Sequence, residues 1–318
     1  MSIITVSNLK GGVGKTSLAV NTAHALSKRF CETLLIDLDP QGDASALLKR
    51  RMPNSSEQRI GEQNSGEQNS GEIHAKNTGE ELFGRFIAAC RGQIEEVRPS
   101  LSLLSGHTLA RLSPSRNLDS LTEQPEFLSR ILEELAQLYD NVVIDTPPSW
   151  GDVHKATLPC SELVIIPVDP SEMSVRAAIK FLNQASEIAP ISALLVRTLV
   201  SRRATQIAAH SQKKLEQEFL SEKREAAGEC LPPKRVMLKG VRKDQGVQPE
   251  IYLSSSTIFR SELVHKLTFQ KRTAFEHRDL TLLQGGYMQL AKEVEEVLAL
   301  SEPAAEEEND LEFDLAFG

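Results

Sequence analysis

A glycine-rich segment near the start of the chain combines residue types that bind phosphate groups. Residues 8–17 read Asn-Leu-Lys-Gly-Gly-Val-Gly-Lys-Thr-Ser and follow the apolar run 3–6. The glycines allow a tight turn whose backbone N–H groups point at anionic oxygens. Lys15 can reach the β- and γ-phosphates, and the hydroxyl of Thr16 can ligate Mg²⁺. The segment therefore predicts a phosphate-binding loop between a strand and a helix.

Two positions of this loop depart from the usual phosphate-loop pattern. That pattern begins with glycine, where this chain has Leu9, and this chain adds a second lysine at Lys10. Two uncompensated lysines in one loop repel each other. The second lysine therefore indicates that the loop binds a dense negative charge.

Two further apolar runs end in carboxylates. Residues 34–39 read Leu-Leu-Ile-Asp-Leu-Asp, and residues 142–145 read Val-Val-Ile-Asp. Ligands of open α/β sheets bind at the carboxyl ends of the strands, so Asp37, Asp39 and Asp145 are candidate site residues. The alternative for Asp37 and Asp39 is that they cap the helix that follows them.

The three segments resemble, in the same order, three motifs of the ParA/MinD family of ATPases. The first resembles the deviant Walker motif KGGxGK[T/S], the second the family's DxDPQGxAS motif, and the third its Walker B strand. The resemblance continues through 171–188 and, less clearly, to about residue 298. It implies a P-loop ATPase, closest to the ParA-type partition ATPases.

The resemblance also implies a role for each candidate residue. The residues that hold ATP are Lys10, Gly11, Gly12, Val13, Gly14, Lys15, Thr16 and Ser17. Mg²⁺ is held by Thr16, Asp37 and Asp145, the carboxylates acting on its hydration shell. The catalytic residues are Lys15, which holds phosphates, Asp39, which orients or deprotonates the attacking water, and Lys10, which reaches the nucleotide of a second subunit. ATP is then buried in a homodimer, and residues 146–148 form the switch that senses the γ-phosphate.

Strand-like and helix-like segments alternate along the chain. This predicts a mostly parallel β-sheet with helices on both faces, an α/β fold. The expected strands are 2–6, 33–37, 101–105, 141–145, 162–168, 192–198 and 251–253. The expected helices are 15–29, 80–91, 124–138, 171–188, 203–221 and 286–300. We expect one P-loop ATPase domain over 1–300.

Three segments depart from that pattern. A direct repeat of Gly-Glu-Gln-Asn-Ser at 61–70 predicts a disordered surface loop near 53–79. A lysine- and arginine-rich stretch near 223–244 looks like an insertion relative to the family. The tail, 301–318, has seven acidic residues and no lysine or arginine, and we expect it to be disordered.

The formal net charge of −8 conceals a basic C-terminal region. Residues 197–278 contain 17 lysines and arginines against 9 acidic residues, a net of +8. The family resemblance implies that the ATP-bound dimer binds DNA without sequence preference and that a ParB-like or other cargo-adaptor protein stimulates hydrolysis. The candidate DNA contacts are Arg202, Arg203, Lys213, Lys214, Lys234, Arg235, Lys239, Arg242 and Lys243. We expect a cytoplasmic protein, nucleoid-associated when ATP is bound.

Other functions on the same motifs remain open. A MinD-like membrane-cycling regulator of division ends in a basic amphipathic helix, whereas this chain ends in acids, so no membrane contact is expected. A scaffold that does not hydrolyse ATP is disfavoured by the intact Lys10, Asp39 and Asp145, and a metabolic enzyme of the same fold stays possible. The four cysteines lack the CxxC spacing that an iron–sulfur carrier needs.

Overall fold

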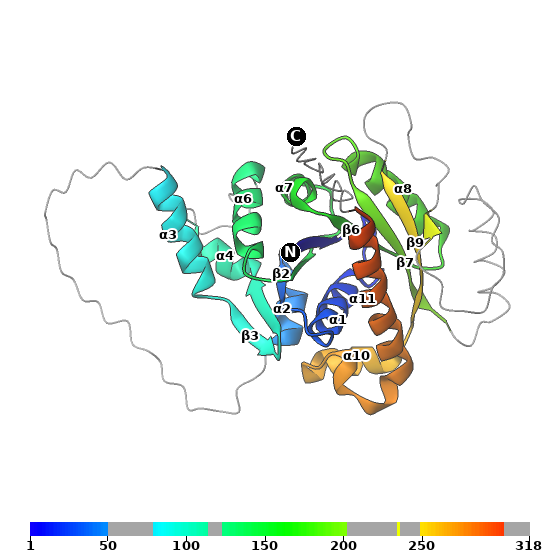
Figure 1. Cartoon of the computed structure of the whole chain (residues 1–318). Helices are drawn as coiled ribbons and strands as arrows, with labels where there is room; N and C mark the ends of the chain where they lie inside the picture. The colour runs from blue at the N-terminus through cyan, green and yellow to red at the C-terminus, as the bar shows by residue number, and fades with distance from the viewer. Residues whose placement is uncertain (50–78, 114–122, 202–233, 236–248, 302–318) are drawn as a thin grey trace, which may run out of the picture.

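The structure is a computed structural model that describes residues 1–49, 79–113, 123–201, 234–235 and 249–301. Among these residues, nine strands form one sheet (Figure 1). In sheet order they are β3 (Glu95–Arg98), β4 (Leu101–Ser105), β2 (Thr33–Asp37), β5 (Asn141–Asp145), β1 (Ser2–Val6), β6 (Leu163–Val168), β7 (Ser192–Val200), β9 (Glu250–Phe259) and β8 (Lys234–Arg235). The edge strands β3 and β8 are antiparallel to their neighbours, and the other pairs are parallel. The predicted fold class is confirmed.

The central strands are apolar on both sides because helices cover both faces of the sheet. In β2 and β5 every residue is buried, as expected for parallel strands inside an α/β fold. Successive side chains point to opposite faces. Thus Leu35 and Val143 pack in one hydrophobic cluster, while Ile36 and Ile144 pack in another on the opposite face.

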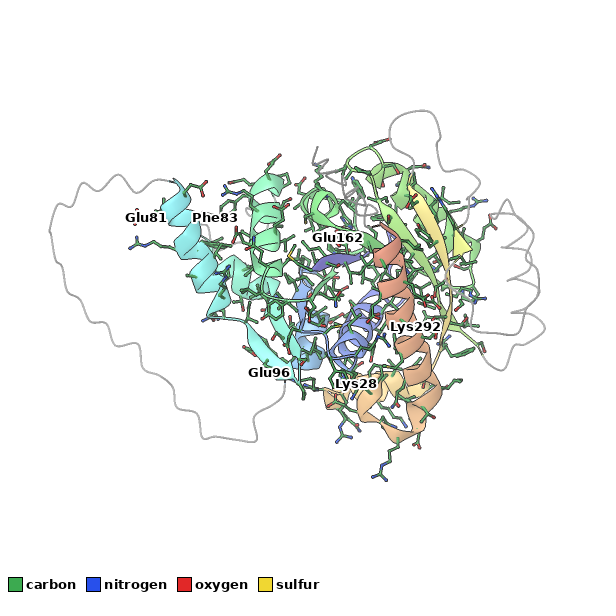
Figure 2. The ribbon with its side chains drawn as sticks, viewed as in Figure 1. Lys28, Glu81, Phe83, Glu96, Glu162 and Lys292 are labelled. Atoms are coloured by element: carbon green, nitrogen blue, oxygen red, sulfur yellow. The ribbon has the colours of Figure 1, made fainter. Side chains whose placement is uncertain are left out.

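Each face has its own set of helices. One face packs against α1 (Lys15–Ser27), α2 (Asp43–Leu48), α10 (Glu262–Gln270) and α11 (Thr281–Ser301). The other face packs against α3 (Gly79–Arg91), α4 (Gly106–Leu112), α6 (Pro125–Ala136), α7 (Asp152–Thr157) and α8 (Glu172–Ala185). Side chains fill the space between the layers (Figure 2). Phe83 of α3 meets Phe127 of α6 edge-on, with ring centroids 5.6 Å apart.

The strands expected from the sequence are confirmed. Strands β1, β2, β4 and β5 have the predicted bounds, and β6, β7 and β9 overlap theirs. The strands β3 and β8 and the helices α2, α4, α7 and α10 were not predicted from the sequence, and the last helix begins at Thr281 instead of the predicted residue 286.

Several expectations fall on residues outside the described ranges. These are the helix 203–221, the repeat loop except for Gly79 at the start of α3, and the tail beyond Ser301 at the end of α11. Within the expected insertion, only Lys234–Arg235 is described, as strand β8.

Candidate functional site

The glycine-rich loop joins β1 to α1 as predicted. Gly12 and Gly14 have φ angles of 74° and 88°, which a side chain would strain. Gly14 is also the N-cap of α1, and no side chain caps this helix. The first N–H groups of α1 are therefore available to an anion, which the positive end of the helix dipole favours.

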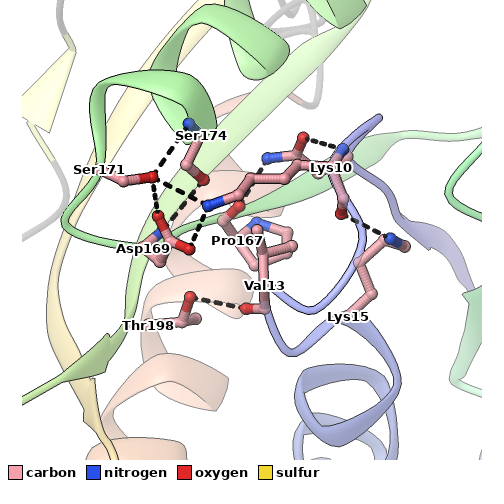
Figure 3. Close-up of polar contacts among 9 residues, drawn as sticks. Lys10, Val13, Lys15, Pro167, Asp169, Ser171, Ser174 and Thr198 are labelled. Carbon is pink, nitrogen blue, oxygen red and sulfur yellow. Dashed lines mark hydrogen bonds and ion pairs between the residues drawn. The ribbon is translucent and has the colours of Figure 1, made fainter.

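Lys15 lies inside the loop. Its side chain is buried, and Nζ donates a hydrogen bond to the Lys10 carbonyl oxygen at 3.1 Å (Figure 3). Burial lowers the pKa of Lys15, and the charges of Asp145 and then Asp39 act in the opposite direction. A buried ammonium bonded to a neutral carbonyl is poised to bind an anion, because a phosphate would compensate its charge better.

Asp37 and Asp145 are register partners at the carboxyl ends of β2 and β5. Both are buried, and Oδ1 of Asp37 and both carboxylate oxygens of Asp145 lack a hydrogen-bond partner among the described residues. Burial, followed by the charge of Asp37, raises the pKa of Asp145 to about 8. Burial also raises the pKa of Asp37.

This pair of carboxylates fits a magnesium ion. Mg²⁺ takes oxygen ligands, keeps several of its waters and is held by one or two carboxylates together with substrate phosphates. Thr16, Asp37 and Asp145 supply such oxygens beside the phosphate-binding loop. A bound Mg²⁺ would neutralise charge on the phosphates and satisfy the buried carboxylates.

Asp39 lies two residues beyond β2 and is half-buried. Its Oδ1 accepts a hydrogen bond from the Gln41 amide at 2.9 Å. Of the two carboxylates that were considered as caps of the following helix, Asp37 does so with one oxygen. Its Oδ2 accepts a hydrogen bond from the Ser45 amide in the first turn of α2 at 2.7 Å. Asp37 thus caps a helix with one oxygen and has the other free of hydrogen bonds within the described part of the chain.

Lys10 turns away from Lys15 and toward the start of α8 (Figure 3). Its Nζ lies 2.5 Å from Oδ2 of Asp169 and 2.9 Å from Oγ of Ser171. Ser171 is the N-cap of α8 and donates to Oδ1 of Asp169 at 2.5 Å, while Ser174 Oγ accepts the Asp169 amide at 3.1 Å. The charge of the second lysine is therefore compensated within the chain. Lys10 does not by itself indicate a dense negative charge in the ligand.

Several residues that support the site were not predicted from the sequence. Asp169 and Ser171 bind Lys10, and Thr198 donates to the Val13 carbonyl oxygen at 2.8 Å. Asp169 stands at the carboxyl end of a buried strand, the same signal that identified Asp37, and Ser171-x-x-Ser174 is a helix start. No signal in the sequence identifies Thr198.

A buried histidine supports the start of the loop. His154 lies on α7, and its Nε2 is 2.9 Å from Oγ of Ser7, the residue after β1. Burial and then the charge of Lys15 lower the pKa of His154 to about 4. The ring stacks on Trp150 with centroids 5.1 Å apart. Trp150 follows the predicted switch segment 146–148 closely in the sequence. Its contact with His154 therefore links this segment to the residue that supports the phosphate-binding loop.

The segment 146–148 follows β5 directly. Its first residue, Thr146, is buried and donates a hydrogen bond to the Val6 carbonyl oxygen at 2.9 Å. This bond ties the start of the expected switch to the strand that enters the phosphate-binding loop.

The expected DNA contacts fall mainly outside the described residues. Only Lys234 and Arg235 are described, in β8. The side chain of Arg235 is 69% exposed and forms an ion pair with Glu250 at 2.6 Å. The other seven candidates are Arg202, Arg203, Lys213, Lys214, Lys239, Arg242 and Lys243.

Within the described ranges, no helix combines the length and the apolar character needed to cross a membrane.

Known proteins are similar to this chain in sequence and in fold. The sequence model of a family described as an AAA domain matches residues 1–193. The sporulation initiation inhibitor protein Soj of Bacillus subtilis is 30% identical over 181 residues, which are 57% of this chain and 63% of Soj. The chromosome partitioning protein ParA of Myxococcus xanthus is 30% identical over 167 residues, 52% of this chain and 51% of that protein. The chain spans about half to two thirds of the length of such curated relatives.

Solved structures share the fold at low sequence identity. The complex of a Cyanothece McdA variant with ATP has a TM-score of 0.59 at 17% identity, covering 94% of this chain and 96% of that one. The cell division ATPase MinD of Pyrococcus furiosus has a TM-score of 0.56 at 15% identity, covering 93% and 99%. The family match covers more than half of the chain, and the Walker-type motifs lie together in the fold. The chain belongs to the ParA/MinD family of P-loop ATPases.

Proposed function

We propose that this chain binds and hydrolyses ATP with Mg²⁺ and that it works as a ParA-type partition or positioning ATPase. In this proposal two subunits enclose ATP between them, the ATP-bound dimer binds DNA without sequence preference, and a cargo-adaptor protein stimulates hydrolysis. The cargo is a plasmid, a chromosome or another large assembly.

One observation carries the ATPase part of the proposal. The buried pair Asp37 and Asp145 presents unpartnered oxygens beside Lys15 and the uncapped N-terminus of α1. Buried carboxylates without partners are costly in an empty protein, and a cation bound with phosphates removes that cost. The arrangement is therefore best explained by a Mg²⁺–nucleoside triphosphate.

The residues of the phosphate-binding loop and Asp39 have different parts in this reaction. Lys15 and the amides of Gly11–Thr16 hold the phosphates, and Asp39 orients or deprotonates the water. Lys10 is expected to leave Asp169 and to reach the nucleotide of the partner subunit. Phosphoryl transfer depends chiefly on positioning and charge neutralisation, which this set of residues supplies.

The partition role is supported by the relatives and by the charge distribution. Soj and the chromosome partitioning protein ParA of Myxococcus xanthus are each 30% identical to this chain over the matched residues, and residues 197–278 carry a net charge of +8. A dimer would present that basic region twice, so that weak phosphate contacts add up only when ATP joins the subunits.

The ATPase is tested by nucleotide binding and turnover in wild type and Lys15→Ala. Lys15→Ala should lose measurable ATP binding by calorimetry and also turnover, because a cation is removed from a site that holds several negative charges. Lys292→Ala, an exposed lysine of α11 paired with Glu296, is the matched control and should behave as wild type. Turnover of Lys15→Ala at the wild-type rate would refute the assignment.

The DNA and membrane alternatives are separated by a parallel titration with ATP. Duplex DNA should bind regardless of sequence, and its affinity should fall roughly 10³-fold or more between 50 and 200 mM salt if about six phosphates are neutralised. Replacing Arg202, Arg203, Lys239 and Lys243 by glutamine should flatten that slope and leave basal turnover intact, whereas Lys180→Gln with Lys292→Gln should not. Binding to anionic vesicles without DNA binding would favour the MinD-like alternative.

A further inference from the structure

The strand pair β7–β9 is irregular where it approaches the phosphate-binding loop. Leu195 is paired with Leu253, Arg197 with Thr257 and Val200 with Phe259. The first interval holds two extra residues on β9, and the second holds one extra residue on β7. Bulges of this kind redirect side chains and are common next to functional sites.

The β7 bulge directs a hydroxyl at the phosphate-binding loop. Leu199 has a φ of 55°, a left-handed conformation that a branched side chain rarely adopts. Thr198, beside it, is 2% exposed, and its Oγ1 donates to the Val13 carbonyl oxygen at 2.8 Å (Figure 3). The strained backbone thus accompanies one specific contact with the loop.

That contact fixes the orientation of a peptide group. In a trans peptide the C=O and the next N–H point in opposite directions. Because Thr198 holds the Val13 carbonyl on the β7 side of the loop, the Gly14 N–H points to the opposite side. Figure 3 shows Lys15 on that opposite side, where the phosphates are expected.

A buried carboxylate holds the β9 bulge. Glu293 of α11 is 0% exposed and accepts hydrogen bonds from three successive hydroxyls, those of Ser254, Ser255 and Ser256. Arg197, the neighbour of Thr198, donates to the carbonyl oxygen of Ser255 at 3.2 Å. Hydrogen bonds therefore link α11 to Arg197 through the β9 bulge, and the backbone joins Arg197 to Thr198, which bonds the loop.

We propose that Thr198 is a positioning residue of the ATP site and that Glu293, through the serine bulge, holds Thr198 in place. Thr198 turns the Val13 carbonyl away from the phosphates and the Gly14 N–H toward them. This inference rests on the proposed ATP binding, but its first step concerns the loop without nucleotide and is testable alone.

Removal of the Thr198 hydroxyl tests that first step. Thr198→Val keeps the shape and removes the donor, and Thr198→Ala is the second variant if valine disturbs the bulge. In nucleotide-free protein we expect the ¹⁵N resonance of Gly14 to shift, since its nitrogen shares the peptide group whose carbonyl loses its partner. Thr198→Ser should restore the wild-type resonance. An unchanged Gly14 resonance in both hydroxyl-free variants overturns the proposal.

The second step is tested by kinetics. We expect Thr198→Val to raise the KM for ATP about tenfold, the loss that corresponds to one hydrogen bond. Glu293→Gln should raise KM in the same direction. Thr257→Val, on the paired strand, is the matched control and should leave KM unchanged.

Wild-type KM with a lowered Tm in Thr198→Val would show a merely structural role and overturn the proposal. If wild type itself failed to bind ATP, the proposed function would fall, while the Gly14 resonance would still decide whether Thr198 orients the loop.

Discussion

The ammonium of Lys10 lies 2.5 Å from the carboxylate of Asp169 in the same subunit. The side chains are 27% and 16% exposed, and Ser171 hydrogen-bonds both of them. A lysine that acts across a dimer must first leave such a site. In the proposed ATP-bound dimer, this ion pair would therefore oppose dimer formation until Lys10 is released.

Asp169→Asn should make the release of Lys10 easier. The variant keeps the shape of the side chain but weakens its hold on Lys10, so ATP-dependent dimerisation should occur at about tenfold lower protein concentration, equivalent to ~1.4 kcal/mol. Sedimentation velocity in ATP measures this midpoint. Asp152→Asn, which breaks the exposed pair with Lys155, is the control and should not move it. A weaker dimer in Asp169→Asn would show that the pair supports the interface instead.

Lys10→Ala should separate nucleotide binding from dimerisation. Each subunit still has its own Lys15, so ATP affinity by calorimetry should stay within a few-fold of wild type. The dimer should fail, because the charge across the interface is no longer neutralised. Dimerisation that persists in Lys10→Ala with ATP would mean that Lys10 serves its own subunit only.

The buried Asp145 should make the nucleotide-free protein less stable as pH rises. The pKa of Asp145 is about 8 in the folded state, against an ordinary value of 3.8. Its contribution to the free energy of unfolding is therefore greatest below pH 3.8 and is lost as the pH rises through 8. Asp145→Asn removes this dependence. The unfolding free energy of the variant should therefore rise relative to wild type by at most about 1.4 kcal/mol per pH unit up to pH 8.

Urea unfolding at pH 6, 7, 8 and 9 without nucleotide measures this difference for Asp145→Asn. The exposed Asp152→Asn should show a constant difference from wild type across the series. A pH-independent difference for Asp145→Asn would show that the Asp145 carboxyl is not held neutral by the fold.

Among the ion pairs described, the pair Arg98–Glu276 should contribute most to the free energy of unfolding. The side chain of Arg98 is 3% exposed, forms a bidentate contact with Glu276 at 3.0 Å and donates to the carbonyl oxygen of Lys271. Arg98→Met leaves these groups unpaired and should cost about 3 kcal/mol of unfolding free energy. Arg176→Met, which breaks an exposed pair with Glu172, should cost less than about 1 kcal/mol. Equal losses in the two variants would contradict this ranking.

Local sequence patterns were sufficient for the central sheet and for bringing together the groups that we assign to ATP and Mg²⁺. The loop 8–17 and the strands ending at Asp37 and Asp145 have contiguous signals, and the parallel register then brings Asp37 beside Asp145. The short helices α2, α4 and α7 were missed because six or seven residues hold too little periodicity to distinguish them from turns.

The supporting residues of the site could not be predicted in the same way. Lys10 and Asp169 are 159 positions apart, and Val13 and Thr198 are 185 apart. These contacts depend on the strand order and, for Thr198, on the bulge in β7. Tertiary packing determines them, and single-sequence patterns carry no record of it.

In the proposed function, this site encloses ATP between two subunits and Asp39 acts on the water. Light scattering of Asp39→Ala with saturating ATP and Mg²⁺ tests it most directly, because the variant should bind nucleotide yet fail to hydrolyse it. We predict a stable species of twice the monomer mass with ATP intact, and a monomer with ADP. A monomer under saturating ATP, or ATP turnover at the wild-type rate, would contradict the account.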